Sequence, residues 1–260
     1  MSSLIGNGRG LGIGVLAGLL AGFLAGGIGG RLAMRLIAVV AGPSSTGQLT
    51  DNGNAVGDIT TGGTVVLVVF SAVLNGVVGG LVYAALRSSL APLGRARSLV
   101  FGLLILLGLG FTTIAAENRD FTRFGSPILN VALFAAIFVA FGALIVPLAE
   151  RLDRAVPRTA VSRSGPAGIG LALLVGLSLL AGLLTLALFI VTTAQTLAGV
   201  AAPGTGFGLT TSFVLLGLLA SAVLARVGSA FPWSRLPLAV PVLAGTWLTL
   251  RSIATILGVG

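Results

Sequence analysis

The chain of 260 residues is 56% hydrophobic and only 8% charged, and its mean hydropathy is +1.12. Soluble domains carry about 25% charged residues, so this composition excludes an ordinary soluble fold. It predicts instead an all-α, polytopic bundle of transmembrane helices that forms a single integral membrane domain, 1–260, with the lipid bilayer as its surroundings. The formal net charge is +9, but the arginines lie between hydrophobic stretches, which argues against nucleic acid as a partner.

Several reactive side chains are missing from the sequence. It has no Cys, no His and no Lys, since all 15 basic residues are Arg. Their absence excludes disulfides, thiolate and imidazole metal sites, a Ser-His dyad and a Schiff-base lysine. No acidic residue lies inside a predicted span. We therefore expect no enzymatic activity, no catalytic or metal-binding residue and no cofactor.

Seven apolar stretches are long enough to cross about 30 Å of hydrocarbon at 1.5 Å per residue. They are residues 11–41, 64–86, 98–115, 127–149, 167–194, 209–226 and 237–257. Ten arginines occupy alternate loops, whereas the intervening loops hold only Arg119 and Arg123. By the positive-inside rule the N-terminus is cytoplasmic and the C-terminus is outside, in a multi-pass protein of the cytoplasmic membrane.

A glycine occurs at every fourth position from Gly6 to Gly30, and most of this row lies in the first stretch. In lipid no hydrophobic force drives helices together, so small residues one turn apart matter because they let two backbones approach closely. The row predicts that four of these residues pack against a neighbouring helix, namely Gly14, Gly18, Gly22 and Gly26.

The first stretch is also long. A cleaved signal peptide is the alternative reading, but the apolar pattern continues to Ala41, beyond the length of a signal core. About 31 helical residues would extend roughly 46 Å. The helix must therefore tilt, kink near Gly26 and Gly27, or project beyond the bilayer.

Arg31 and Arg35 lie one turn apart near the outer end of this stretch. They either snorkel to outer headgroups or line a buried site or cavity. The segment 31–38, RLAMRLIA, follows the glycine-rich helix and resembles a group of polytopic membrane proteins from high-GC bacterial genomes whose activity is unknown. Two later segments share the resemblance, namely Pro127-Ile-Leu-Asn130 and Glu150-Arg-Leu-Asp153 after Gly142. The resemblance implies a membrane location and no particular mechanism.

Residues 42–63 form the longest polar connection, with two acids and no basic residue. Turn signals at Asn52-Gly53 and Gly62-Gly63 predict an external loop. The run 51–54, DNGN, has part of a calcium-loop pattern but lacks the later glutamate, so it predicts no metal site. Asn75 follows near the middle of the second span, where it either fixes helix packing or binds a substrate.

Acidic and basic residues gather on the predicted outer side. Four of the six acids lie there, namely Asp51, Asp58, Glu117 and Asp120. An arginine at membrane depth is costly unless it is paired. We therefore predict that Asp58 or Glu117 folds back onto an arginine, with snorkelling to lipid as the alternative. The candidate outer polar cluster consists of Arg31, Arg35, Asp58, Glu117 and Arg251.

The basic linker at 150–166 is a candidate boundary between two halves of the domain. Gly12-Ile13-Gly14 matches Gly168-Ile169-Gly170, so the halves either form a parallel repeat or share only packing glycines.

Two functions remain open. The first is a non-enzymatic accessory or structural subunit, whose glycine-rich helices pack against partner membrane subunits or against a second copy. The second is a transporter or channel-like protein for a small molecule, anion or lipid, in which the outer arginines attract an anionic group. A wide cavity near Asn75 would favour transport. The sequence names no substrate and no partner.

Overall fold

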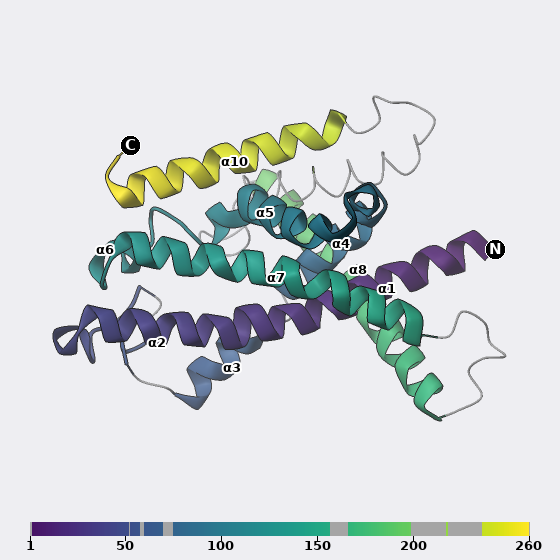
Figure 1. Cartoon of the computed structure of the whole chain (residues 1–260), viewed down its shortest axis with the longest axis horizontal. Helices are drawn as coiled ribbons and strands as arrows, with labels where there is room; N and C mark the ends of the chain where they lie inside the picture. Colours follow the sequence, from purple (N-terminus) through teal and green to yellow (C-terminus); the bar gives the residue numbers. More distant parts are fainter. Residues whose placement is uncertain are drawn as a thin grey trace.

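The computed structural model describes residues 2–51, 53–57, 60–69, 75–156, 166–198, 217 and 236–259. Within these ranges the chain is a helical bundle, which confirms the predicted all-α class (Figure 1). The two ends of the chain lie at opposite ends of its long axis.

The helices follow one another along the chain. They are α1 (Ser2–Ala21), the π-helix η1 (Gly22–Gly29), α2 (Gly30–Ala41), η2 (Pro43–Ser45), α3 (Thr61–Val69), α4 (Gly76–Leu90), η4 (Ala91–Ala96), α5 (Arg97–Leu109), η5 (Gly110–Thr112), α6 (Asp120–Arg123), α7 (Pro127–Ala155), α8 (Pro166–Leu197) and α10 (Leu236–Leu257). Helix α7 begins at Pro127, which suits the first turn because it has no N–H to leave unpaired. It ends at Ala155, so the first residues of the predicted linker at 150–166 are helical.

Five stretches within the described ranges are long and apolar enough to cross a membrane. They are Gly8–Ala41, Gly76–Thr112, Pro127–Ala155, Ile169–Ala187 and Ala239–Leu257. The second stretch contains both α4 and α5, which separate at Gly94, where φ is +54° and the helix is interrupted. The predicted span 209–226 lies outside the described residues apart from Gly217, so the count of seven stays a prediction.

The long first helix changes its hydrogen-bonding pattern in the middle. Residues Gly22–Gly29 form a π-helix, which includes the pair Gly26 and Gly27 where a kink was one of the predicted alternatives. The Gly30 N–H donates to the carbonyls of both Gly26 and Gly27 as the chain returns to α-helix. A π-helix has more residues per turn than an α-helix. The π-segment therefore sets which face of α2 meets each neighbour.

Glycine backbones touch where α1 crosses α4. A Cβ added to Gly18 would lie 2.7 Å from the Cα of Gly80, and one added to Gly76 would lie 2.6 Å from the Gly18 carbonyl oxygen. A Cβ on Gly80 would lie 2.6 Å from the carbonyl oxygen of Gly14. These distances are shorter than carbon and oxygen atoms tolerate, so no side chain fits at this crossing.

The same arrangement recurs elsewhere in the bundle. Gly142 of α7 lies against the backbone of α5, where an added Cβ would be 2.7 Å from the Ser98 carbonyl oxygen. Gly245 of α10 lies against Gly108 of α5, with an added Cβ at 2.7 Å from the Gly108 Cα. Close backbone contact therefore joins α5 to α7 and to α10, as it joins α1 to α4.

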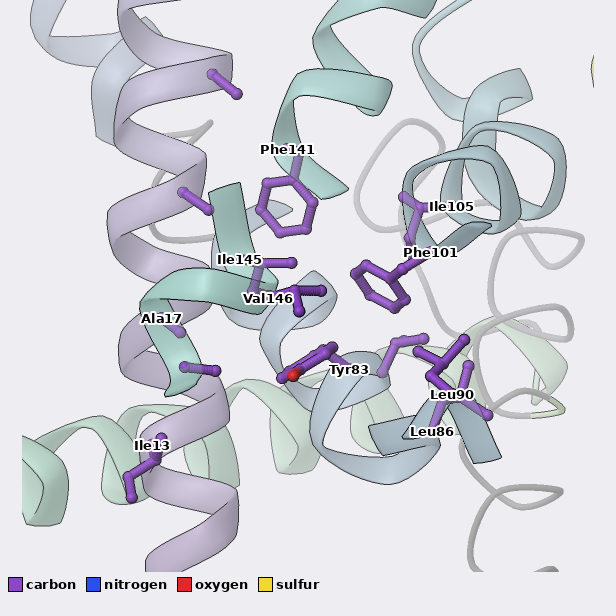
Figure 2. Packing of buried hydrophobic residues seen from close by; sticks show 14 of the residues in the cluster. Ile13, Ala17, Tyr83, Leu86, Leu90, Phe101, Ile105, Phe141, Ile145 and Val146 are labelled. Carbon is purple, nitrogen blue, oxygen red and sulfur yellow. The ribbon is translucent and has the colours of Figure 1, made fainter. Parts of the chain in front are cut away.

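Aromatic rings fill the space that these helices enclose. Figure 2 shows Tyr83, Phe101 and Phe141 pointing toward one another from α4, α5 and α7. The Tyr83 and Phe101 rings meet edge to face with centroids 5.3 Å apart, and the Phe101 and Phe141 centroids are 6.5 Å apart. Ile13 and Ile145 belong to the same hydrophobic cluster and are fully buried. The centre of the bundle is thus closed by apolar packing.

Candidate functional site

The predicted outer polar cluster is present only in part. Arg31 and Arg35 lie on α2 beside the loop that leads to α3, and Arg35 Nη1 donates to the Gly57 carbonyl over 3.4 Å. The Nε atom of Arg31 is buried and has no hydrogen-bond partner among the described residues. Asp58 lies outside the described residues, so its pairing with either arginine stays a prediction.

The structure does not join the other members to these arginines. Glu117 is exposed in the turn before α6, and Arg251 is exposed on α10. No ion pair connects Glu117 with Arg31, Arg35 or Arg251 in the described part of the chain. Asn75 is exposed at the start of α4.

Two of the predicted outer acids bind backbone groups. The Asp51 N–H donates to both carboxylate oxygens of Asp120, at 3.1 and 3.2 Å, and the Arg119 N–H donates to Asp51 Oδ2 over 2.7 Å. Arg123 donates from its guanidinium to the carbonyl of Leu49 over 3.1 Å. These bonds fasten the loop after α2 to the turn that carries α6.

The carboxyl of Asp120 titrates abnormally in this position. Burial raises its pKa above the ordinary value of 3.8. The hydrogen bond from Asp51 and the charge of Arg123 act in the opposite direction, whereas the negative charge of Asp51 adds to the rise. The pKa of Asp120 is raised overall because desolvation is the largest of these effects.

A buried amide holds the same turn from the side of α7. Asn130 is 1% exposed, and its Nδ2 donates to the carbonyls of Phe121 and Phe124 at 3.0 and 2.7 Å. Both carbonyls belong to α6 or its end, so one side chain satisfies two backbone acceptors. Asn130 therefore fixes the start of α7 to the turn before it.

The opposite end of the bundle carries an ion-pair cluster that the sequence analysis missed. Arg9 of α1 and Arg87 of α4 share the carboxylate of Asp153 on α7, with Arg87 Nη2 at 2.7 Å from Asp153 Oδ2. One turn earlier, Glu150 pairs with Arg97 at the start of α5. These five residues, called the Asp153 cluster below, join α1, α4, α5 and α7 at the predicted inner end.

Arg9 also caps helix α7. Its Nη2 donates to the backbone carbonyls of Asp153 and Val156 at 2.7 and 2.8 Å. The last carbonyls of an α-helix have no partner within the helix, and their partial negative charge favours a cation. The Arg9 and Asp153 side chains are 18% and 19% exposed, so water screens their attraction only in part. The cluster therefore ties the helices at this end.

A signal for the Asp153 cluster was present in the sequence. Glu150 and Asp153 lie three residues apart, so they share one side of the helix end. They follow the apolar stretch 127–149, on the predicted side of the membrane where the arginines accumulate. The spacing predicts the shared face of the two acids, but it does not predict which arginines pair with them.

An apolar groove runs between η1–α2 and α7, with a volume of about 350 Å³. Its walls are apolar on both sides, with Leu24, Ala25, Gly29, Leu32, Ala33 and Leu36 facing Leu133, Ala136, Ile137, Ala140 and Leu144. A groove without a polar group offers no hydrogen bond to a polar substrate. Among the described residues, no group of three or more acidic side chains could hold a metal ion.

Helical packing and composition together define the class of the protein. Five helices long and apolar enough to span a bilayer, joined through backbone contacts, make it a polytopic helical membrane protein. No family model, curated protein or solved structure is similar to the chain. The resemblance to membrane proteins of high-GC bacteria therefore stays a prediction.

Proposed function

We propose that the protein is a non-enzymatic accessory or structural subunit of the cytoplasmic membrane, which packs against a partner membrane subunit or a second copy through glycine-rich helix α8. We further propose seven crossings, with the N-terminus in the cytoplasm and the C-terminus outside. The position of the two termini at opposite ends of the bundle supports an odd number of crossings (Figure 1).

An apolar surface on α8 that the described residues leave exposed carries the proposal. Leu173, Leu177, Leu180 and Leu184 are spaced by four and three residues, which places them on one side of the helix. They are 63%, 63%, 52% and 60% exposed. This spacing is the one through which two helices interlock as knobs into holes.

Open glycines lie beside this leucine stripe. A Cβ added to Gly170 or Gly176 would meet no heavy atom within 4 Å, whereas one added to Gly18 or Gly142 would collide with a neighbouring backbone. Small residues at a lipid-facing surface allow another helix to approach closely. Gly14, Gly18 and Gly142 have partners within the chain, whereas Gly170 and Gly176 meet no described residue and are open to a partner helix.

A transporter or channel-like protein is the second candidate. The buried Nε of Arg31, which has no hydrogen-bond partner in the described part of the chain, favours this alternative because an anion would supply an acceptor. Closed apolar packing at the centre of the bundle favours the accessory subunit.

The test is purification at native expression in a mild detergent, with the particle mass measured and every co-purifying chain identified. A stoichiometric membrane partner or a homo-oligomer that depends on α8 would support the proposal. Recovery as a lone monomer would overturn it and leave transport as the candidate, with Arg31, Arg35 and Arg251 as the first residues to replace.

Two variants make the test specific to the surface. Gly176→Leu would fill the space beside the leucine stripe, and Leu177→Ala would remove one of its knobs, so each should reduce the fraction of assembled particle. Leu174→Ala is the matched control, because Leu174 is 52% exposed on the same helix but points about 100° away from Leu173 and lies on the side opposite Gly176. Equal loss in the control and in Leu177→Ala would show that the stripe is not the interface.

A further inference from the structure

One side of helix α10 faces away from the bundle and is covered by no segment that the structure describes. The side toward the bundle carries Pro241, Gly245 and Thr249, which are buried and recur every four residues. The outward side, called the Trp247 face below, consists of the exposed residues Val240, Leu243, Trp247, Leu250 and Arg251. Their intervals of three, four, three and one residues keep them within about 100° of the helix surface. The Trp247 face is thus a continuous apolar strip with one charge.

The charge of Arg251 lies at membrane depth. Leu248 is the middle residue of the spanning stretch Ala239–Leu257, and Arg251 follows it by three residues, or about 4.5 Å. The end of the stretch is about 9 Å beyond Arg251. Arginines inside spans normally face the interior of a bundle and are paired there, because an unpaired charge in hydrocarbon is costly. Arg251 instead faces away from the bundle, is exposed, and forms no ion pair in the described part of the chain.

Trp247 adds a second hydrogen-bond donor to this face. It lies one turn before Arg251 and next to the middle of the span, and it is 68% exposed. Tryptophans that face lipid gather at the headgroups, where the indole N–H finds an acceptor. The side-chain hydrogen bonds that α10 makes among the described residues come from Thr246, Thr249 and Thr255. Within these ranges the indole N–H and the guanidinium therefore remain two unpartnered donors, one turn apart.

We propose that the Trp247 face binds a transmembrane helix of another protein through an aspartate or glutamate that this helix carries at the depth of Arg251. A carboxylate accepts hydrogen bonds from the guanidinium and from the indole N–H, and its charge neutralises the arginine. The exposed apolar side chains at intervals of three and four residues then pack against the same helix. The inference rests on the proposed function, to which it adds the chemistry of the partner subunit.

A second copy of this chain does not supply that acid. Glu150 and Asp153 are the acidic residues within the five spanning stretches, and both pair with arginines at the other end of the bundle. The remaining four acids lie in the connections between spans. The Trp247 face therefore differs from the leucine stripe of α8, which has no charge and suits a second copy as well as another protein. Lipid phosphate is the other source of negative charge, and the experiment separates it from a carboxylate.

The test reconstitutes the full-length protein in phosphatidylcholine vesicles with synthetic transmembrane peptides of leucine and alanine. One peptide carries aspartate three residues from its middle, the second carries asparagine there, and the third carries leucine. Because the chain has no Lys, an amine-reactive dye labels only its N-terminus, and energy transfer to a labelled peptide measures binding. We expect the aspartate peptide to bind about tenfold more tightly than either of the others.

Two variants of the Trp247 face should change this preference. Arg251→Gln should abolish it. Trp247→Phe keeps an aromatic ring but removes the N–H, so it should reduce the preference about threefold, and it provides a second test if Arg251→Gln does not fold by circular dichroism. Equal binding of the three peptides, or a preference that survives Arg251→Gln, would overturn the proposal. Loss of the preference when phosphatidylglycerol is added to the vesicles would also overturn it, because Arg251 would then be a contact for lipid headgroups.

Two control variants locate the binding surface. Arg119→Gln removes an exposed arginine outside the spans and lowers the net charge equally, so it should leave the preference unchanged. Leu177→Ala alters the leucine stripe of α8 and should also leave it unchanged. Loss in either control would overturn the proposal, in favour of diffuse charge or of the α8 surface. A native particle that does not depend on α8 would instead contradict the proposed function and leave the peptide result as it stands.

Discussion

Replacing Gly18 by alanine tests whether backbone contact between α1 and α4 stabilises the bundle. The added Cβ would lie 2.7 Å from the Cα of Gly80. Carbon atoms in contact are about 3.5–4.0 Å apart, so the two helices must separate by about 1 Å at this crossing. Both sides of the contact are backbone, so no rotamer change can relieve the overlap.

The magnitude follows from two opposing effects. Overpacking costs about 1–3 kcal/mol, and a rigid contact should reach the upper part of that range. The higher helix propensity of alanine offsets up to about 1 kcal/mol. We therefore expect Gly18→Ala to lower the free energy of unfolding by about 1–2 kcal/mol.

Gly10→Ala is the control on the same helix, because no heavy atom lies within 4 Å of its added Cβ. Helix propensity alone then applies, and the variant should be unchanged or stabilised by up to about 1 kcal/mol. Unfolding in mixed micelles of rising SDS content, followed by circular dichroism, compares the two proteins. Equal stability of Gly18→Ala and Gly10→Ala would refute the reasoning.

Three further predictions concern the two ends of the bundle. Asp153→Asn should lower the free energy of unfolding by about 2 kcal/mol in the same assay. The loss should be smaller than for a fully buried ion pair because the Asp153 cluster is partly exposed. An unchanged free energy of unfolding would show that these ion pairs are solvated surface contacts. The raised pKa of Asp120 means that the folded loop binds this proton more tightly than the unfolded chain. Protection of the amides of residues 48–51 and 53–56 from hydrogen exchange should therefore be greatest below pH 3.8 and fall as the pH rises through the raised pKa. Asp120→Asn should remove that dependence, and its persistence would assign it to another group. Asn130→Ala leaves the carbonyls of Phe121 and Phe124 without their donor and should cost about 1–3 kcal/mol in thermal unfolding, whereas Ser126→Ala, whose side chain caps no helix N–H, should change little.

The pattern of apolar residues predicts the helices better than it predicts the contacts between them. The long apolar stretches predict helices because the bilayer permits few other backbones, and the start of α7 at Pro127 follows from local chemistry. The glycine row of α1 predicts that another helix packs closely against it but does not predict which helix, since the chain has 40 glycines distributed over its helices. Only the folded chain brings Gly76 and Gly80 of α4 to that row.

Charges were harder to place than helices. Arg9 and Asp153 are separated by 144 positions in the chain, so their pairing depends on which helix ends become neighbours. Asp58 or Glu117 was predicted to pair with an arginine, and no ion pair joins Glu117 to Arg31, Arg35 or Arg251 in the described part of the chain. The other two outer acids, Asp51 and Asp120, accept hydrogen bonds from backbone N–H groups. A carboxylate can accept a hydrogen bond from any donor that a loop places near it, and the sequence pattern does not predict the conformation of the loops.

The number of residues in the π-helix η1 and its geometry together set the rotation of α2 about the helix axis. Each residue of an α-helix turns the chain by about 100°, and a π-helix turns it less, so return of η1 to regular α geometry with all eight residues kept would swing α2 by nearly a third of a turn. Arg31 and Arg35 would then leave the loop before α3 and point into hydrocarbon. Loss of one residue together with a return to α geometry would largely cancel that rotation. Either change alone would redirect every side chain that follows as far as Ala41.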